Sequence, residues 1–304
     1  MIAVLLMAYG TPRSRDEILP YYTDIRRGRP PTPELLAELT GRYEAIGGLS
    51  PLAALTEAQR DALQAELDAR EPGRFRVFLG LKHAHPMIEE TVAEVAALRP
   101  ESIVGLVLAP HFSSYSIGQY VDRARTAAEP HGIPVIGIDS WATEPAYVEF
   151  LADDISARLS TMPPSTRVLF TAHSLPQRII DAGDPYPDQL RATATAVADR
   201  VGLREGDQWS IAWQSAGRTP EPWIGPDILE VIDELGSQSN PSDGVLVCAC
   251  GFVADHLEVL YDLDIEAQHR AASHGLAFAR TACVNDNVDV MGALAERVIG
   301  AVVG

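Results

Sequence analysis

The chain has 304 residues, enough for two domains or one large α/β unit, and 46% of them are hydrophobic, so a sizeable core can be buried. Asp and Glu outnumber Lys and Arg by 42 to 24, and the resulting net charge of −18 excludes non-specific binding to nucleic acid or an anionic membrane surface. Three cysteines are too few for a disulfide framework, so we expect a reducing compartment.

Short apolar runs alternate with helical patterns along the chain, and each run predicts a strand. The eight runs are 2–8, 74–80, 103–109, 134–138, 167–171, 209–214, 244–249 and 276–280. The first run is too short to cross a bilayer, which takes ~20 residues, and no basic residue precedes it as in a signal peptide. We interpret it as a buried strand and expect a cytoplasmic protein without integral membrane association.

Helix-start signals fall between the apolar runs. Thr32 stands before Pro33, a residue that suits the first position of a helix. Thr56 and Gln59 have the spacing of a capping box, which predicts that a helix opens at Thr56. Strands that alternate with helices predict parallel sheets covered by helices on both faces.

The predicted fold is therefore α/β, with two Rossmann-like, doubly wound halves and the active cleft between them. We expect residues 1–150 to form the first half and residues 151–304 the second. The helical stretch at about 14–70 is long for one crossover, so we interpret it as an insertion in the first half.

Polar clusters come after the predicted strands repeatedly. They begin at Tyr9, Lys82, His111, His173, Gln214 and Gly251. Because ligands of open α/β sheets bind beyond the carboxyl ends of the strands, we expect these loops to meet at one cleft. The sequence has no glycine-rich phosphate loop, G-x-S-x-G, H-E-x-x-H or C-x-x-C, which excludes the commonest nucleotide, hydrolase and zinc motifs.

His173 directly follows the apolar run at 167–171. An imidazole at a strand end can ligate a metal or act as a general base near neutral pH. The alternative is a histidine that is hydrogen-bonded at the strand end and holds the next loop. Its position alone leaves both interpretations open.

Acidic residues recur every four positions at Glu258, Asp262 and Glu266. In a helix they lie one above another on one face, where like charges repel. A hydrated divalent cation would relieve this repulsion, because hard cations take carboxylate and water oxygens. The alternative is a solvated acidic face in an acidic protein.

Arginines cluster at 26–29 and recur at Arg42 in an otherwise acidic chain. Guanidinium groups can grip planar carboxylates or phosphates in bidentate fashion, and the alternative is ordinary surface charge. Cys248, Cys250 and Cys283 are interpreted as small buried hydrophobic residues.

Taken together, the motifs of this chain resemble the ferrochelatase family, in particular its coproporphyrin ferrochelatase branch. The resemblance covers nearly the whole chain. Its motifs are LLMAYGTP (5–12), YYTDIRRGR (21–29), RYEAIGGLSPL (42–52), GLKH (80–83), LAPHFSSYS (108–116), TAHSLP (171–176), GDPYPDQL (183–190), WQSAGRTPEPWIGPD (213–227) and GFVADHLEVLYDLD (251–264).

The resemblance implies roles for individual side chains. His173 and Glu258 match the residues regarded as iron ligands, which face the macrocycle on one side. Tyr9 matches the tyrosine that approaches the metal from the opposite face. Asp262 and Glu266 match an acidic ridge proposed as an outer metal site. The positions that contact the porphyrin and its propionates are Arg26, Arg42, Tyr43, Ser50 and Tyr120.

The resemblance also implies an activity: insertion of Fe2+ into coproporphyrin III, which gives Fe-coproporphyrin (coproheme) in haem biosynthesis and releases two pyrrole protons. Two alternatives stay open, a protoporphyrin IX ferrochelatase and a non-catalytic tetrapyrrole or metal carrier. We expect Fe2+ as a substrate, no prosthetic group, and no [2Fe–2S] cluster, since such clusters usually need four protein ligands. We expect a monomer that binds porphyrin and iron and transiently contacts a downstream haem-pathway enzyme.

Overall fold

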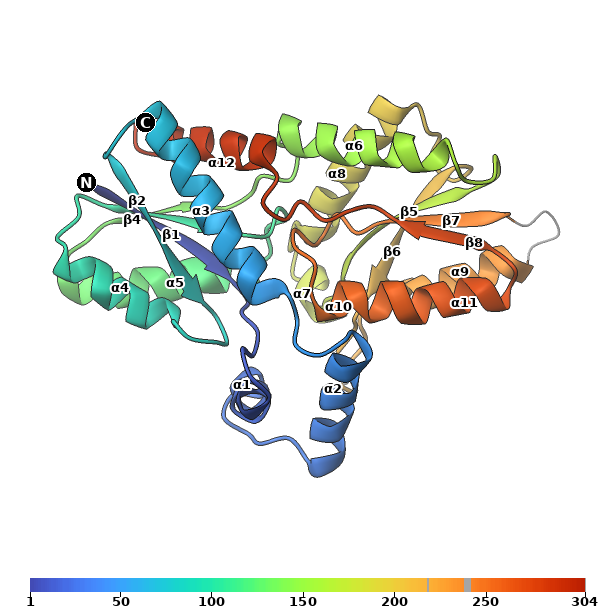
Figure 1. The fold of residues 1–304 in the computed structure, drawn as a ribbon, viewed down its shortest axis with the longest axis horizontal. Helices are drawn as coiled ribbons and strands as arrows, with labels where there is room; N and C mark the ends of the chain where they lie inside the picture. The colour runs from blue at the N-terminus through green and yellow to red at the C-terminus, as the bar shows by residue number, and fades with distance from the viewer. Residues whose placement is uncertain (218, 238–241, 304) are drawn as a thin grey trace.

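The chain forms two four-stranded sheets flanked by helices (Figure 1). The computed structural model describes residues 1–217, 219–237 and 242–303. The strands are β1 (Ile2–Ala8), β2 (Phe75–Leu81), β3 (Ile103–Val107), β4 (Val135–Ile138), β5 (Arg167–His173), β6 (Trp209–Gln214), β7 (Gly244–Cys248) and β8 (Ala277–Arg280). All eight predicted strands are confirmed, with bounds that differ by at most two residues.

The strand order is the same in both sheets. It is β2-β1-β3-β4 in the first and β6-β5-β7-β8 in the second, and every pair of neighbours is parallel. Parallel neighbours need crossover connections, which place helices over the faces of a sheet. The predicted fold of two doubly wound α/β halves is confirmed, and β1 and β5 occupy equivalent places in their sheets.

Helices and helical turns supply the connections. The α-helices are α1 (Ile18–Ile25), α2 (Pro33–Ala45), α3 (Leu52–Arg70), α4 (Ile88–Ala97), α5 (Ile117–Ala128), α6 (Pro145–Leu159), α7 (Gln177–Asp181), α8 (Tyr186–Val201), α9 (Ile228–Ser237), α10 (Leu257–Leu260), α11 (Gln268–Ser273) and α12 (Val288–Ala301). Two 3-10 turns, η1 (Arg15–Glu17) and η2 (Glu129–His131), and one π-helical segment, η3 (Asp262–Ala267), complete the set. None of the helices in the described ranges has the length and apolarity that a bilayer crossing requires.

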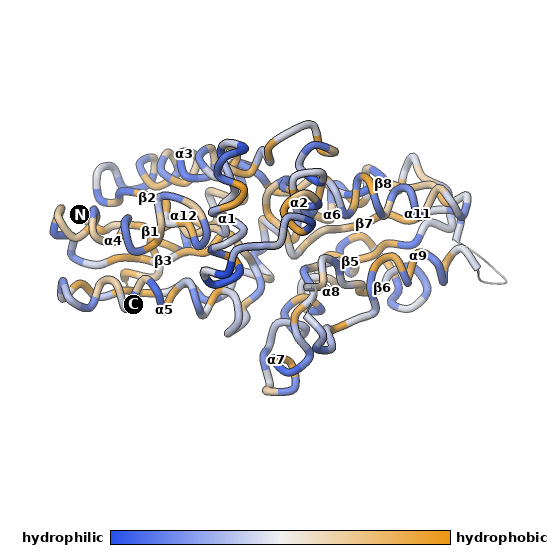
Figure 2. The backbone as a smooth tube through the Cα atoms, turned by 90° about the horizontal axis from the view of Figure 1, so that it is seen from below, coloured by the Kyte–Doolittle hydropathy of each residue, from blue (hydrophilic) through white to orange (hydrophobic). Residues whose placement is uncertain are grey.

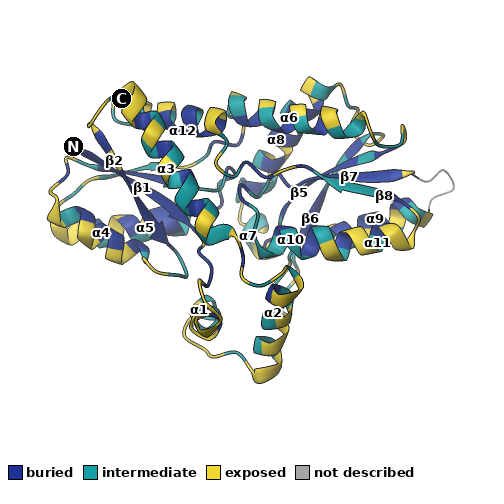
Figure 3. Cartoon of the chain, viewed as in Figure 1, coloured by how far each residue is buried: buried dark blue, intermediate teal, exposed yellow. Residues whose placement is uncertain are grey.

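The central strands are buried on both faces, because side chains alternate across a strand. All seven residues of β1 are buried. Val4 and Leu6 pack in a hydrophobic cluster with α3 and α12, whereas Leu5 and Met7 pack with α4 and α5. Figure 3 shows the dark, buried strands between more exposed helices, and Figure 2 shows hydrophobic stretches along the strands.

One hydrophobic cluster extends through both halves of the molecule. It contains Leu63 of α3, Leu294 of α12, Ile155 of α6, Leu190 of α8 and Phe170 of β5. The last helix, α12, packs along α3, so it returns to the first sheet although it follows the second in sequence (Figure 1). This shared core fixes the carboxyl edges of the two sheets relative to each other. The division of the chain at residue 150 stays a prediction.

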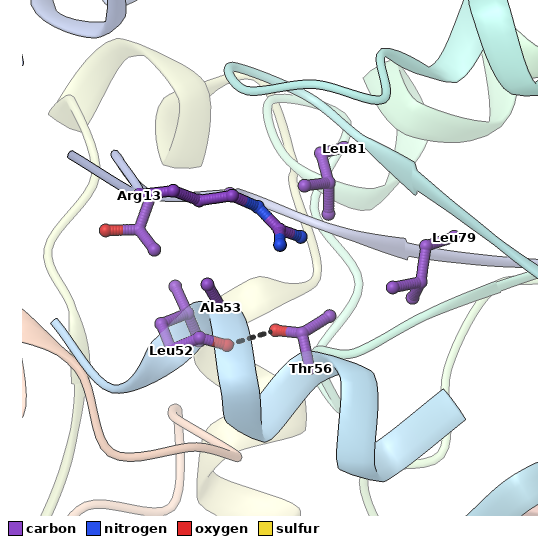
Figure 4. Close-up of a pocket in the computed structure, with 8 residues that line it drawn as sticks. Arg13, Leu52, Ala53, Thr56, Leu79 and Leu81 are labelled. Atoms are coloured by element: carbon purple, nitrogen blue, oxygen red, sulfur yellow. Dashed lines mark hydrogen bonds between the residues drawn. The ribbon is translucent and has the colours of Figure 1, made fainter. Parts of the chain in front are cut away.

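The two helix-start predictions of the insertion have different outcomes. Thr32 caps α2 as expected, since its hydroxyl accepts a hydrogen bond from the amide of Leu35. The start expected at Thr56 is wrong, because α3 begins one turn earlier, at Leu52. There the hydroxyl of Ser50 accepts a bond from the Leu52 amide, and the Thr56 hydroxyl inside the helix donates to the Leu52 carbonyl (Figure 4).

Candidate active site

His173 is the last residue of β5, and its ring is fixed by the backbone. Its Nδ1 lies 2.5 Å from the carbonyl oxygen of Ser174. Since a carbonyl only accepts, Nδ1 carries the proton of this bond, and Nε2 keeps a lone pair in the neutral ring. The side chain is 34% exposed, so a ligand can reach Nε2. The strand-end placement thus presents the reactive nitrogen outward.

Glu258 lies between two imidazoles. Its Oε1 is 3.7 Å from Nε2 of His173, and its Oε2 is 3.7 Å from Nε2 of His256. The Nδ1 of His256 is held by the carbonyl of Ala254 at 2.9 Å, which repeats the orientation of His173. Each imidazole nitrogen and the Glu258 carboxylate attract one another when a proton or a cation lies between them. His256 stands two residues before Glu258 in sequence, but sequence reasoning assigned it no role.

The protonation of Glu258 reflects opposing effects. Burial pushes the pKa of Glu258 up, but the electrostatic attraction of the His173 and His256 imidazoles outweighs burial, so the pKa lies below its usual value. The side chain still has 37% of its surface exposed. Glu258 is therefore an ionised carboxylate that a cation can reach.

A buried amide links β5, β6 and α10 beneath this pair. Gln214 at the end of β6 is fully buried. It accepts a bond from the Thr171 hydroxyl at 2.9 Å and donates to the backbone carbonyl of Glu258 at 3.1 Å. Because both polar ends of the amide are satisfied, Gln214 fixes α10 against the strand that carries His173.

Tyr9 follows β1, in the place that corresponds to the end of β5 in the other sheet. Its ring is 42% exposed, yet desolvation is the largest cause that raises its pKa, and the charge of Glu258 raises it further. Glu258 also raises the pKa of Tyr21 and Tyr43, so the phenols of the first half lie within its electrostatic reach.

A second group of side chains surrounds Tyr9 within the first half. The ring of His83 lies 4.6 Å from that of Tyr9, and its Nδ1 is 2.6 Å from a carboxylate oxygen of Asp24. The ammonium of Lys82 lies 5.0 Å from the ring centroid of Tyr120 and donates to Gln119. Burial and the charge of Arg123 lower the pKa of Lys82 to about 8. Sequence reasoning noted the Lys82 cluster after β2 but did not select it.

Tyr43, Ser50, Tyr120 and Arg26 are placed differently from one another. Tyr43 and Tyr120 are buried, and the Tyr43 hydroxyl lies 3.5 Å from that of Thr11. Ser50 is buried at the start of α3. Arg26, at the end of α1, interacts with its neighbours, through the carbonyl of Arg29 and over the ring of Tyr22. The structure thus brings the phenols together and gives Arg26 local contacts.

The acidic residues beyond Glu258 are not on one regular α-helix. Asp262 and Glu266 lie in the π-helical η3, where the amide of Glu266 bonds to the carbonyl of Tyr261, five residues earlier. The α-helical stacking considered from the four-residue spacing therefore does not apply here. Their repulsion is offset by Arg42 of α2, which donates to Asp262 Oδ1 at 3.1 Å and lies 3.9 Å from Glu266 Oε1.

Asp262 has the more unusual environment of the two. It is buried, and its Oδ2 accepts a bond of 2.5 Å from the hydroxyl of Ser215. Burial and the charges of Glu258 and Glu266 raise its pKa to about 6, against the lowering effects of Ser215 and Arg42. Excess negative charge at this place is therefore costly, and the ridge is electrostatically primed for a cation.

Two hollows of the described residues lie away from His173 and Glu258. A cavity of about 10 Å³ beside Thr11 and Arg13, shown in Figure 4, has room for one water. A wider groove of about 500 Å³ beside β8 is lined by Arg280, which pairs with Asp264 and Asp255. No group of three His, Cys, Asp or Glu side chains within the described ranges is arranged to hold a metal ion. The three cysteines are buried with free thiols.

Comparison with known proteins gives a consistent result. A model of the ferrochelatase family matches residues 1–301. A protein named ferrochelatase from Herpetosiphon aurantiacus is 44% identical over 292 residues, 94% of each chain. The coproporphyrin III ferrochelatase of Oceanobacillus iheyensis is 42% identical over 98% of this chain and 96% of its own length. That of Bacillus subtilis is 41% identical over 98% and 97%.

Solved structures show the same fold at low sequence identity. The structure of SirB from Bacillus subtilis with Fe3+ matches with a TM-score of 0.58 and 11% identity, over 99% of this chain and 95% of the other. CbiX, described as the terminal enzyme for siroheme biosynthesis in denitrifying bacteria, matches with a TM-score of 0.55 and 12% identity, over 98% and 99%. With the family model matched over nearly its whole length, this chain belongs to the ferrochelatase family.

Proposed function

We propose that this metal chelatase inserts Fe2+ into coproporphyrin III and releases Fe-coproporphyrin and two protons. The single observation that carries the proposal is the placement of His173 Nε2 3.7 Å from the ionised Glu258, within electrostatic reach of Tyr9. Full-length relatives named coproporphyrin III ferrochelatase support the choice of porphyrin.

In this proposal the second half performs the chemistry. The Nε2 lone pair of His173 and the carboxylate of Glu258 are both able to accept a proton or to ligate iron. A free porphyrin has two N–H groups to lose, one for each acceptor. Because Nδ1 of His173 is fixed by the Ser174 carbonyl, the ring does not need to reorient when Nε2 takes up a proton.

The first half binds the macrocycle in this proposal. Tyr9 approaches the metal from the face opposite His173. Coproporphyrin III carries four propionates, and the residues that contact the porphyrin are Arg26, Arg42, Tyr43, Ser50 and Tyr120. Binding energy from propionates remote from the nitrogens is available to bend the macrocycle, which exposes the pyrrole nitrogens to the incoming metal.

Asp262 and Glu266 supply the iron. Hydrated Fe2+ is a cation that carboxylates and water both coordinate, so an acidic ridge next to Glu258 collects it from solution. Burial and neighbouring negative charge raise the pKa of Asp262 to about 6, and a cation at the ridge removes that penalty. Glu258 then completes the loss of the water shell and passes the metal inward.

The cellular setting of this reaction belongs to the same proposal. We propose a cytoplasmic monomer that holds no [2Fe–2S] cluster and transfers its product through transient contact with a downstream haem-pathway enzyme. The buried free thiols of Cys248, Cys250 and Cys283 are consistent with a packing role for the cysteines.

An anaerobic insertion assay tests the function directly. Purified protein is mixed with Fe2+ and either coproporphyrin III or protoporphyrin IX, and the loss of the metal-free absorption spectrum is monitored. Faster turnover of coproporphyrin III supports the proposal. Preference for protoporphyrin IX would assign the other substrate, and tight porphyrin binding without a spectral change on adding Fe2+ would indicate a carrier.

A further inference from the structure

Arg42 joins two parts of the chain that are 220 residues apart in sequence. Its guanidinium donates to Asp262 at 3.1 Å and lies 3.9 Å from Glu266. It also lies 4.6 Å from the ring centroid of Tyr261. The helix α2 of the first half is thus attached by its arginine to the acidic ridge of the second.

The helix that carries Arg42 has little other anchorage. Tyr43 is its one buried residue, and α1 is its main packing partner among the described elements. Figure 1 shows α1 and α2 projecting below the two sheets, and Figure 3 shows that nearly all of their residues are exposed or intermediate. A segment with few buried apolar contacts moves at low free-energy cost. The position of Arg42 is therefore set largely by the charges that it pairs with.

Those charges compete with each other during the proposed reaction. The N–H groups that Arg42 directs at Asp262 and Glu266 cannot bind a porphyrin propionate at the same time, so a propionate competes with the ridge for this guanidinium. The carboxylates of Asp262 and Glu266 likewise attract either Arg42 or a hydrated divalent cation. The contacts of Arg42 thus affect the binding of both the porphyrin and the cation.

We propose that Arg42 couples the binding of the two substrates. In the free protein it neutralises Asp262 and Glu266. A carboxylate of the porphyrin then draws the guanidinium away and frees the ridge for the cation. The inference rests on the proposed function, because it requires a carboxylate-bearing porphyrin. By linkage, a cation on the ridge strengthens porphyrin binding by the same factor.

The test measures cation binding without turnover. Mn2+ serves as the cation, and its free concentration is measured by electron paramagnetic resonance. Zinc coproporphyrin III serves as the porphyrin, because it already carries a metal. Coupling between sites typically amounts to 5–150-fold in affinity. We expect saturating zinc coproporphyrin to lower the Mn2+ dissociation constant by at least about fivefold, and the variant Asp262→Asn/Glu266→Gln to lose this porphyrin-dependent binding.

Two arginine variants separate coupling from simple charge. In Arg42→Gln the ridge is already free, so Mn2+ binding to the free protein tightens and the ratio of the two dissociation constants falls to about one. Arg15→Gln is the matched control. It removes an arginine that pairs with Glu44 of the same helix α2 and that has no assigned role at the ridge or at the porphyrin, so the ratio stays as in the wild type. If Arg42→Gln does not fold, Arg42→Lys takes its place. Its ratio of dissociation constants is expected to lie between the wild-type ratio and one.

Three outcomes overturn the proposal: no coupling in the wild type, an unchanged ratio in Arg42→Gln, or an equal loss of coupling in Arg15→Gln. Because no metal insertion is measured, the result is independent of turnover. Any of these outcomes together with normal Fe2+ insertion would reject the role of Arg42 alone. Failure of insertion with both porphyrins would reject the proposed function.

Discussion

The two halves of the molecule share one strand order but carry different side chains beyond their equivalent strands. β1 leads to Tyr9, whose neighbours are the ring of His83 and the phenols of Tyr43 and Tyr115. β5 leads to His173, which faces the carboxylate of Glu258. The same scaffold thus presents phenols beside a closed His83–Asp24 pair of 2.6 Å on one side, and a wider His173–Glu258 pair of 3.7 Å on the other. Chemistry here resides in the loops and not in the sheets.

The comparison assigns binding to the first half and chemistry to the second, and the largest expected effect is on the chemistry. His173→Ala removes both a base and a ligand, so we expect kcat to fall by about 10²–10⁴-fold. Porphyrin affinity, measured by fluorescence titration, should change little. Near-normal turnover by the folded variant would remove His173 from the mechanism.

A smaller effect is expected when the first half is altered. Arg26→Gln removes a charged contact to a porphyrin carboxylate, which is worth about 1.5–3 kcal/mol. We expect the KM for porphyrin to rise by about tenfold or more with kcat unchanged. Steady-state kinetics at fixed Fe2+ measure both values. A fall in kcat at unchanged KM would contradict the assignment of porphyrin binding to the first half.

The acidic ridge sharpens the comparison, because it serves the metal and not the porphyrin. Asp262→Asn/Glu266→Gln should raise the KM for Fe2+ by about 3–10-fold, because the variant loses the Coulomb attraction between the cation and the two carboxylates. Turnover at saturating iron should be retained. An unchanged KM for Fe2+ would make the ridge ordinary surface.

The smallest effect concerns stability. Burial lowers the pKa of Lys82 from 10.5 to about 8, so between these values the unfolded chain binds more protons than the folded one. The unfolding free energy therefore rises with pH across this window. We expect this rise, about 1–2 kcal/mol, to be missing in Lys82→Met. Denaturant titrations at pH 8 and pH 10 compare the two proteins, and parallel curves would contradict the assigned shift.

Local patterns predicted much of the fold. Each strand is a short apolar run, since a parallel strand covered on both faces needs apolar residues at every position. Thr32 was recognised as a cap because its bond to Leu35 is local. The helix start predicted at Thr56 was wrong because the spacing of a capping box also occurs inside a helix. The observed start depends on Ser50.

The site was predictable only in part. His173 was identified because it ends a strand, and the acidic residues because they recur every four positions. Their spacing does not distinguish an α-helix from the π-helical η3, so the local geometry was not predictable. The contact between Arg42 and Asp262 joins residues 220 apart, and no pattern in a single sequence reveals it.

Single-turnover kinetics test the division of labour between the halves most directly. Wild type, His173→Ala and Arg26→Gln are each saturated with coproporphyrin III and mixed anaerobically with excess Fe2+. Saturation removes any binding defect, so we expect Arg26→Gln to insert iron at nearly the wild-type rate and His173→Ala to be at least about 10²-fold slower. A slow Arg26→Gln together with a normal His173→Ala would contradict the assignment of binding to the first half and chemistry to the second.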